Sequence, residues 1–518
     1  MLLWAGNTDA QQTFERYYSG VGTANWNLIE LENGNYFTGM ANESGTSVMN
    51  PQGIIQHSQC YAIDSMLGLQ SVAKYTDNEF YFVTAYRTDS CTSLGTIVIP
   101  HIDPLIGKMD SLGNVLRLER YALNTDECMS VVNDLTVCAD GSVIAWGIDN
   151  FVALRVDPTG APVWAKQRNM KGSFQFFKEL PSGDVLAGIN MDTAGAVVAR
   201  LDPEGNFLWC KSYIRPDGMV ADCLVESDDS FIITGLTDSL ASTDIFEPLP
   251  PDFHPKVFLM KLNGEGDVQW CKGYDSAPNL WYARQGARIA RAQDGNYVVL
   301  GNLGEPGFNY PSRPFLMKTD QNGDTLWTRS TGRANADYLT VSMLACSDGG
   351  FMYAGQAFGS AGGMFLFKTN EQGYLPCRNL WQTVVVSDLF PTDSSFTFSS
   401  VDGAMAMPAF ATPIDFEVLV PEDPCDGATS IQTWDRHTPR ISIRPNPTPG
   451  RFTVEFQDPL MKDSYYSVYD AMGKLLLQRA ATHGKKTEEV DLTGYAKGTY
   501  VIRFTDPDGV CFERVMLE

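Results

Sequence analysis

The sequence contains 518 residues, of which 44% are hydrophobic, and 62 acidic against 38 basic residues give a net charge of −24. A chain of this length is expected to fold into two or three domains. The negative charge argues against binding to nucleic acid or anionic membranes, and no stretch reaches the roughly 18 apolar residues of a membrane-spanning helix. Abundant glycine and aromatic residues indicate short strands and tight turns, so we expect an all-β protein without a cofactor.

Residues 1–10 have the composition of an incomplete signal peptide. The stretch from Met1 to Gly6 is apolar, and small residues between Thr8 and Ala10 precede Gln11, where a cleavage site would fall. The basic leader of a complete signal peptide is missing. We interpret residues 1–10 as the remnant of a truncated signal peptide, and an ordinary irregular start is the alternative.

A short phrase recurs between residues 11 and 378: a basic residue, any residue, Asp or Asn, two further residues, and Gly. Asp or Asn at the first position and Gly at the fourth are typical of a type I turn that closes a hairpin. An apolar strand precedes each copy and a further strand follows it. Six clear copies and one weaker copy are Lys108–Gly113, Arg155–Gly160, Arg200–Gly205, Lys261–Gly266, Lys318–Gly323, Lys368–Gly373 and Met49–Gly53.

A second phrase precedes the first in each repeat. It is a tight turn, usually containing Asp-Gly or Asn-Gly, that leads into a nearly continuous apolar strand, as at Asn33–Gly39 and Asp294–Gly301. Apolar runs without alternation indicate strands with both faces covered. Each repeat therefore contains four strands. Seven repeats predict a seven-bladed β-propeller over residues 11–378, and a linear β-solenoid is the alternative.

The seventh repeat lacks room for a fourth strand between Gly373 and Cys377. The segment Thr13–Gly20 resembles the fourth strands of other repeats, so we predict that it pairs with the strand ending near Lys368 and closes the last blade. Tryptophans stand four positions after the turn glycine in four copies. We expect them to pack between blades rather than to stack on sugars. They are Trp164, Trp209, Trp270 and Trp327.

One side of the predicted disc should carry long connections between second and third strands, at residues 86–106, 236–257 and 302–314. Variable loops on a rigid scaffold commonly bind ligands. The alternative is that these loops only cover the disc. The candidate ligand-face residues are Phe246, Phe253, His254, Trp281, Tyr282, Phe308 and Tyr310.

Residues 437–518 show alternating strands and frequent turns, which predict a small antiparallel β-sandwich. Three motifs follow one another: a Pro-Asn-Pro turn, a Tyr-Asp to Gly-Lys turn, and a Gly-Thr-Tyr strand start. In order and spacing they resemble the type A sorting domain of Bacteroidetes type IX secretion cargo. The motif residues are Pro445, Asn446, Pro447, Gly450, Tyr469, Asp470, Gly473, Lys474, Gly498 and Tyr500.

The resemblance implies partners in the type IX translocon and its processing machinery, and a protein that is secreted or held on the outer-membrane exterior. Two departures bear on processing: Arg444 stands where an aromatic residue is common, and the sequence ends in Glu518 instead of lysine. Residues 379–436 form the connector between the two parts. We predict that this connector forms strands, because it contains Val384 to Val386.

No arrangement typical of a catalytic or metal centre emerges from the sequence. The five histidines are dispersed, and the recurrent Asp residues lack the spacing of calcium sites, so turn geometry explains them better. The 11 cysteines contain no CxxC pair, but export permits disulfides. Two pairings are candidates, Cys377 with Cys425 and Cys210 with Cys223.

These observations favour a non-enzymatic surface protein whose propeller binds a glycan or a protein through the long-loop face. An accessory subunit of a surface assembly is the first alternative. A carbohydrate-active enzyme is the second, although no pair of carboxylates can be singled out among 62 acidic residues.

Overall fold

The computed structural model contains strands and no helix among the residues that it describes. Contacts divide the chain into two units, Met1–Cys425 and Asp426–Glu518. No helix within the described ranges is long and apolar enough to cross a membrane. The structure describes residues 13–18, 24–40, 45–62, 66–92, 98–123, 132–147, 152–166, 172–191, 194–214, 218–226, 229–237, 255–275, 280–281, 288–304, 312–332, 336–359, 363–375, 385–391, 394–395, 404–408, 412–414, 441–456, 464–469, 475–506 and 509–518.

The described part of the first unit contains seven antiparallel sheets. Sheet 1 contains β2 (Ala24–Glu30), β3 (Tyr36–Met40), β4 (Gly45–Met49) and β5 (Ile55–Ala62). Sheet 2 contains β6 (Met66–Lys74), β7 (Glu79–Thr92), β8 (Val98–Asp110) and β9 (Val115–Leu123). Sheet 3 contains β10 (Asp134–Val137), β11 (Val143–Trp146), β12 (Ala153–Val156) and β13 (Pro162–Lys166). Sheet 4 contains β14 (Gly172–Glu179), β15 (Val185–Met191), β16 (Gly195–Leu201) and β17 (Phe207–Ser212).

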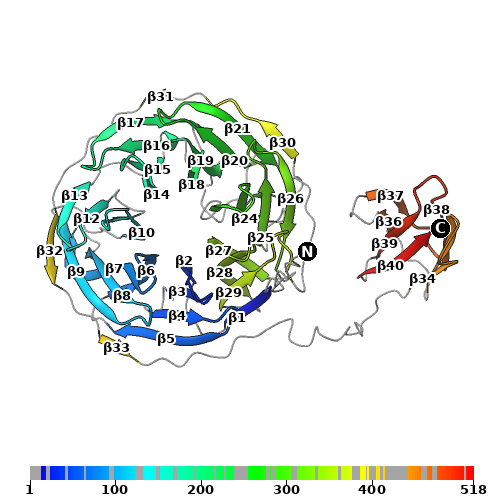
Figure 1. Cartoon of the computed structure of the whole chain (residues 1–518), viewed down its shortest axis with the longest axis horizontal. Helices are drawn as coiled ribbons and strands as arrows, with labels where there is room; N and C mark the ends of the chain where they lie inside the picture. The colour runs from blue at the N-terminus through cyan, green and yellow to red at the C-terminus, as the bar shows by residue number, and fades with distance from the viewer. Residues whose placement is uncertain are drawn as a thin grey trace, which may run out of the picture. The chain divides into compact units, whose positions relative to one another are not determined.

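The remaining three sheets follow the same plan. Sheet 5 contains β18 (Met219–Val225), β19 (Phe231–Leu236), β20 (Val257–Leu262) and β21 (Val268–Asp275). Sheet 6 contains β22 (Leu280–Trp281) and β23 (Arg288–Arg291), both beside β24 (Tyr297–Gly304), then β25 (Ser312–Thr319) and β26 (Thr325–Ser330). Sheet 7 contains β27 (Ala336–Ala345), β28 (Phe351–Gly359), β29 (Gly363–Lys368) and β1 (Phe14–Tyr18). These sheets resemble the blades of a β-propeller, with the first strand of each innermost (Figure 1).

A continuous circle of contacts between inner strands closes the ring that Figure 1 shows. Sheet 1 contacts sheet 7 through the Leu28 N–H, which donates to Ser342 Oγ at 3.0 Å, and sheet 2 through Asn27, which donates to Ser71 Oγ at 2.6 Å. The other contacts are Ser71 with Asp134, Thr136 with the Phe177 carbonyl, Lys178 with Asp222, the Ile289 N–H with Asp222, and Arg288 with the Val341 carbonyl. The circle returns to its starting sheet, which excludes the linear solenoid.

The N-terminal strand completes sheet 7. β1 pairs antiparallel with β29, with Phe14 opposite Lys368 and Tyr18 opposite Met364. The pairing predicted from the sequence is therefore confirmed. It adds β1 as the outermost strand of sheet 7, so the outer edge of β29 is paired rather than open.

The core lies between adjacent sheets rather than at the axis. The second strands β11, β15 and β19 are buried along their whole length, as their continuous apolar sequences predict. Between sheets 3 and 4, for example, the rings of Trp146 and Phe177 lie 5.1 Å apart. Each sheet therefore needs both neighbours to bury its faces.

The recurrent phrase forms the predicted turn between the third and fourth strands. In sheet 6 the Gly323 N–H donates to the Asp320 carbonyl at 3.1 Å, and Asp320 Oδ1 accepts the N–H groups of Asn322 at 2.9 Å and Asp324 at 2.8 Å. Gly323 has a φ of +81°, which residues with a Cβ rarely adopt. The turn prediction is confirmed, and these hydrogen bonds explain why Asp or Asn recurs.

Replacing Asp320 by alanine should lower the free energy of unfolding by about 1 kcal/mol, because two turn N–H groups lose their acceptor. Asp320→Asn should be nearly neutral, since Asn263 and Asn370 accept the equivalent N–H groups in sheets 5 and 7. Urea unfolding of the two full-length variants measures the difference. Equal losses in both variants would contradict this explanation of the turn.

One predicted long connection is instead an extended hairpin. Within residues 86–106, β7 continues to Thr92 and β8 begins at Val98, and these two residues pair with each other. The sequence expectation of a loop was wrong because the added residues keep the strand pairing of sheet 2. The other two predicted connections, at 236–257 and 302–314, fall mostly outside the described residues.

The candidate pairing of Cys210 with Cys223 does not form a disulfide. Cys223 is a free, buried thiol on β18, the innermost strand of sheet 5. Cys210 lies on β17, the fourth strand of sheet 4, and belongs to a different hydrophobic cluster. Residues close in sequence are therefore separated across the width of a sheet. Cys377 and Cys425 lie outside the described residues.

Four short strands come from the connector: β30 (Val385–Asp388), β31 (Ser394–Ser395), β32 (Ala404–Pro408) and β33 (Thr412–Ile414). We call them the rim strands. Each pairs with the fourth strand of a different sheet in the ring. Val385 and Val386, from the valine run on which the strand prediction was based, lie in β30.

The described part of the second unit contains two antiparallel sheets. The first contains β34 (Ile441–Arg444), β35 (Arg451–Phe456) and β38 (Thr487–Asp491). The second contains β37 (Leu475–Ala480), β36 (Tyr465–Tyr469), β39 (Gly498–Asp506) and β40 (Gly509–Leu517). Side chains from both sheets share one hydrophobic cluster, which includes Phe456 and Phe504 with ring centroids 4.6 Å apart.

Candidate functional site

A tyrosine near the end of the fourth strand links each of several sheets to the next. Its hydroxyl donates to the carbonyl of the glycine in the neighbouring turn, as for Tyr121 to Gly160 at 2.9 Å and Tyr213 to Gly266 at 2.7 Å. Tyr274 makes the same bond to the Gly323 carbonyl. Near the start of the chain, the Tyr18 hydroxyl donates to the Gly53 carbonyl and the Tyr61 hydroxyl donates to the Gly113 carbonyl. These bonds fix the recurrent turns to one another around the disc.

The recurrent tryptophans occupy the same junction. Trp209 donates its indole N–H to the Gly264 carbonyl at 3.0 Å, and a Cβ on Gly266 would lie 2.9 Å from its ring. Trp164 packs equivalently against Gly205 and donates to the Pro203 carbonyl at 3.1 Å. The prediction that these residues pack between repeats is confirmed. The indole N–H groups and the aromatic faces of these tryptophans make contacts between neighbouring sheets.

Charged pairs connect the two recurrent phrases within a sheet. The basic residue that opens the first phrase binds the acidic residue of the earlier turn, as for Lys318 with Asp294 at 2.7 Å and Lys368 with Asp348 at 2.6 Å. Partial burial opposes ionisation of Asp294, but hydrogen bonds from Lys318 and Asn296 hold its pKa below the usual value. The pairs orient the turns that follow the inner strands. Those turns surround the axis on one side of the disc.

Four charged residues on the inner strands interact with one another near the axis. Lys178 Nζ lies 3.3 Å from Asp222 Oδ1, and this carboxylate raises the pKa of Lys178. Burial raises the pKa of Asp134, while Arg288 and Lys178 favour its ionised form. Two acids and two bases thus balance their charges. The presence of these charged residues near the axis is explained by the contacts that they make between neighbouring inner strands.

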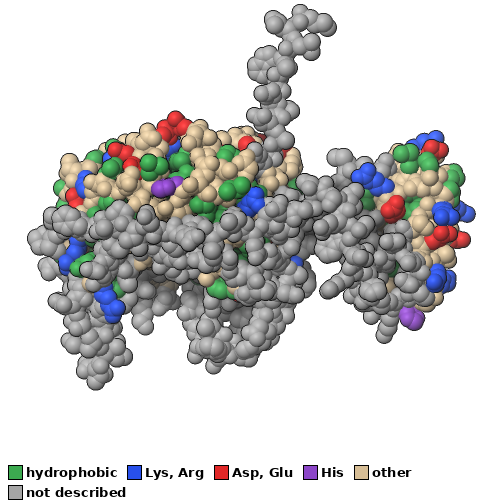
Figure 2. Space-filling model, turned by 90° about the horizontal axis from the view of Figure 1, so that it is seen from below, with side chains coloured by type: hydrophobic (Ala, Val, Ile, Leu, Met, Phe, Trp, Pro, Cys, Tyr) green, Lys and Arg blue, Asp and Glu red, His purple; other side chains and the backbone are tan. Residues whose placement is uncertain are grey.

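A cavity of about 750 Å³ lies beyond this cluster, where the inner strands of sheets 3 to 6 end. We call it the axial cavity. Its lining includes Glu179, Leu180, Pro181, Val225, Glu226 and Arg291. It opens on the side that carries the recurrent short turns, opposite to the predicted long-loop face. Acidic side chains also gather along one edge of the ring (Figure 2).

The polar groups of the axial cavity are held in place by neighbouring sheets. Arg291 forms an ion pair with Glu226 Oε1, which also accepts the Tyr297 hydroxyl at 2.9 Å. Glu179 Oε2 accepts the Ala139 N–H of sheet 3 at 2.6 Å. Among the described residues, these contacts involve Glu179 Oε2 and Glu226 Oε1, and none is made to the other oxygen of either carboxylate. The cavity therefore presents two carboxylates, one guanidinium and apolar side chains.

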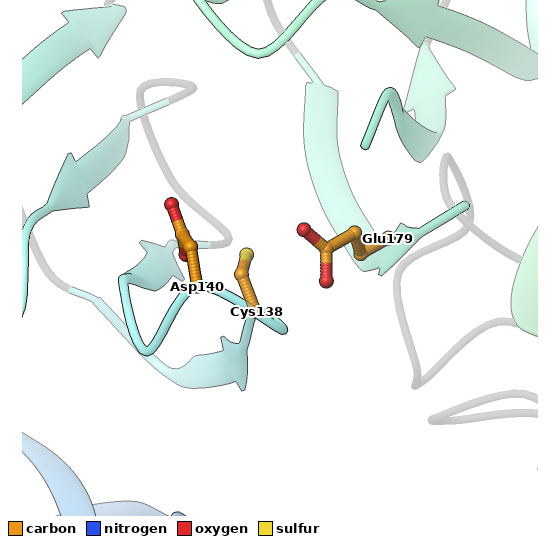
Figure 3. A group of neighbouring side chains, drawn as sticks. All are labelled: Cys138, Asp140 and Glu179. Carbon is orange, nitrogen blue, oxygen red and sulfur yellow. The ribbon is translucent and has the colours of Figure 1, made fainter. Parts of the chain in front are cut away.

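Cys138, Asp140 and Glu179 form a cluster beside the cavity, with ligand atoms within 4.8 Å of one another (Figure 3). Burial, with a smaller effect of Glu179, raises the pKa of the Cys138 thiol to about 11. Metal ions bind the thiolate, which this environment disfavours. Asp140 already binds Ser142 and Arg155, at 2.9 Å to the Ser142 N–H and 3.1 Å to the guanidinium. Turn and ion-pair contacts explain this group without a cation.

Of the seven candidate residues of the predicted ligand face, one lies in a described strand. Trp281 lies in β22, opposite Leu303 of β24, and only its backbone is described. The other six candidate residues lie outside the described ranges: Phe246, Phe253, His254, Tyr282, Phe308 and Tyr310. Their ligand-binding role therefore stays a prediction.

The motif residues of the second unit hold its C-terminal strand. Asn446 Nδ2 donates to the Arg514 carbonyl at 2.7 Å, and its Oδ1 accepts the Met516 N–H at 2.9 Å. Pro445 and Pro447, on either side of Asn446, are exposed. The turn thus fastens β40 through one amide side chain.

Other motif residues shape the same unit. Gly450 has a φ of +131°, and a Cβ there would lie 2.6 Å from Thr493 Cγ2. Tyr469 pairs with Val501 of β39, and buried Tyr500 donates its hydroxyl to the Ala496 carbonyl. Gly498 begins β39. Asp470, Gly473 and Lys474 lie outside the described residues.

Residues 442–518 match a family described as the secretion system C-terminal sorting domain. The match supports export as type IX secretion cargo. It indicates a secreted protein of the cell surface. The match lies within the second unit and does not extend to the first. A search of curated proteins found no significant match.

Solved structures with related folds share little sequence with the chain. The WD40 domain of Neurospora crassa Pan2 is 12% identical with a TM-score of 0.44, over 69% of this chain and 92% of that one. A Bacteroides caccae protein of unknown function is 12% identical with a TM-score of 0.34, over 61% and 93%. The Bacillus licheniformis GH43 protein BlXynB is 9% identical with a TM-score of 0.29, over 97% and 90%. Similarities of this size carry no functional argument.

The axial cavity was missed by sequence reasoning because its residues come from four different repeats. A signal for the tyrosine bonds was present, however. In four repeats a tyrosine follows the turn glycine at the same interval, as Tyr61 follows Gly53. The tyrosines are Tyr61, Tyr121, Tyr213 and Tyr274. That recurrence would have predicted an inter-sheet contact in the same way as the tryptophans.

Proposed function

We propose that this protein is an exported seven-bladed β-propeller that binds a basic segment of a partner protein in its axial cavity. The seven described sheets and the pairing of β1 with β29 support the blade count. The shared core of the two C-terminal sheets supports a β-sandwich. The sorting-domain match supports passage through a type IX translocon, as in Bacteroidetes, to the outer-membrane exterior.

The proposal of a basic ligand rests on the pair of carboxylates on the cavity wall. Glu179 and Glu226 each keep one oxygen directed to no partner within the described residues. The protein as a whole carries a net charge of −24, which attracts cations over long range. Lysine and arginine side chains combine a positive head with an apolar stem. The stem would contact Leu180, Pro181 and Val225.

A protein ligand fits this lining better than a glycan. No aromatic side chain lines the described part of the cavity, although sugar-binding and other ligand pockets commonly use aromatic faces. The carboxylates instead offer strong acceptors to ammonium and guanidinium groups. We therefore propose binding rather than catalysis. The long-loop residues around Phe246 and Tyr310 constitute a second predicted surface on the other side of the disc.

The test is binding of a short fluorescent lysine- and arginine-rich peptide to the full-length protein, followed by anisotropy. We expect saturable binding that weakens with added salt. Removing both carboxylates, in Glu179→Gln/Glu226→Gln, should weaken it several-fold. Glu204→Gln is the matched control, because Glu204 is an exposed acid in a turn on the same side of the disc and should leave binding unchanged.

Two outcomes would overturn the proposed ligand. Equal weakening by the cavity variant and by Glu204→Gln would mean that only net charge attracts the peptide. Binding of neutral oligosaccharides together with no peptide binding would instead favour the glycan expectation. Neither outcome affects the export assignment, which rests on the sorting domain.

A further inference from the structure

The connector between the two units is part of the ring's rim. Each rim strand adds a fifth antiparallel strand to one sheet: β30 pairs with β21, β31 with β17, β32 with β9, and β33 with β5. Figure 1 shows β30, β32 and β33 on the outside of the ring. The connector thus passes sheets 5, 4, 2 and 1 in turn. This order is opposite to the order of the sheets in the sequence.

The rim strands are anchored by side chains as well as by backbone pairing. The Leu389 N–H donates to the Cys271 carbonyl of β21 at 2.9 Å. The Leu389 side chain packs over Gly273, where an added Cβ would lie 3.0 Å from Leu389 Cδ1. Val386, opposite Tyr274, joins the hydrophobic cluster between sheets 5 and 6. Phe390, the next residue after Leu389, is 89% exposed.

Sheet edges that end in open N–H and C=O groups invite pairing with other chains. Four fourth-strand edges of this ring are occupied by the rim strands. The glycine at position 273 leaves space for Leu389, so strand and rim fit each other in shape. A tether that only linked two units would need neither the backbone pairing nor the apolar contact.

We propose that the rim strands are a built-in lock: they shield the outer edges of sheets 1, 2, 4 and 5 and hold these sheets in the ring. The folded passenger then extends to Ile414 at the end of β33, beyond the predicted boundary at residue 378. Loosening the lock exposes the edges of β21, β17, β9 and β5. The occupant that then competes for them is a second copy of this chain, through edge-to-edge pairing.

The test compares Leu389→Asp and Phe390→Asp in the full-length protein by hydrogen exchange and size-exclusion chromatography. Leu389→Asp places a charge on the half-buried anchor and should accelerate exchange in β30 and β21 by about tenfold. It should also increase the dimer fraction at high protein concentration. Phe390→Asp adds the same charge one residue away on an exposed side chain, and should leave both measurements unchanged.

β26 serves as the internal reference, because no described strand pairs with its outer edge. Accelerated exchange in β21 with unchanged exchange in β26 would support the lock. If Leu389→Asp accelerates exchange throughout the ring, the milder Leu389→Ala variant must still show the local effect in β21 while β26 stays protected. Equal exchange and equal dimer fractions for the Leu389 variants, Phe390→Asp and the wild type would overturn the proposal.

Discussion

Replacing Tyr18 by alanine is expected to lower the free energy of unfolding by about 3–5 kcal/mol, as for other large aromatic side chains removed from a core. Tyr18 is fully buried on β1, in the cluster shared by sheets 7 and 1. It pairs with Met364 of sheet 7, and its hydroxyl donates to the Gly53 carbonyl of sheet 1. Its loss therefore weakens the one junction at which the chain closes on itself. Urea unfolding measures the loss.

The conservative variant separates packing from the hydroxyl. Tyr18→Phe keeps the ring and loses one hydrogen bond, so it should cost only about 1 kcal/mol. Hydrogen exchange should locate the Tyr18→Ala effect in β1 and β29 first. If Tyr18→Ala were as stable as Tyr18→Phe, β1 would not contribute to closure, and the pairing of Phe14 with Lys368 would have no energetic role.

Replacing Gly235 by alanine should lower stability by about 3 kcal/mol, because a methyl group there has no space. Gly235 lies in β19 opposite Val220, beside a shift of register in β18. An added Cβ would lie 1.9 Å from the Met219 carbonyl oxygen, so the inner strand itself must move. Gly355 meets the Leu339 carbonyl at the same distance in sheet 7. Thermal or urea unfolding of Gly235→Ala measures the loss.

Gly494→Ala is the matched control in the same chain. An added Cβ at Gly494 meets no atom within 4 Å, so the same methyl group should change stability by less than about 0.5 kcal/mol. A Gly235→Ala variant as stable as Gly494→Ala would show that the inner strand adjusts without cost. The recurrence of glycine at this position, which ends the second recurrent phrase in several repeats, would then need another explanation.

The two predictions bear on function through the axial cavity. Its lining comes from the ends of inner strands β14, β18 and β23, whose positions depend on the contacts with neighbouring sheets. Closure by β1 and the close approach at Gly235 fix those strands. A variant that loosens the ring without unfolding it should therefore also weaken binding of the basic peptide, in contrast to variants confined to the sorting domain.

Much of this protein was determined by local sequence. The Asp or Asn and the glycine of each recurrent phrase specify a turn through their own backbone geometry, as at Asp320 and Gly323. Continuous apolar runs specified strands buried on both faces, and the incomplete seventh repeat predicted the pairing of β1 with β29. The sorting motifs were recognisable because their residues are close together in the chain.

Other features were decided only by the tertiary structure. Glu179, Glu226 and Arg291 belong to three repeats, and only the packing of consecutive sheets side by side brings them to one cavity. The rim strands pair with edges that lie more than a hundred residues earlier in the sequence, as Val386 does with Tyr274. Strand pairing uses backbone groups that every residue carries, so a short strand in sequence does not specify its partner. The position of the edge in space selects it.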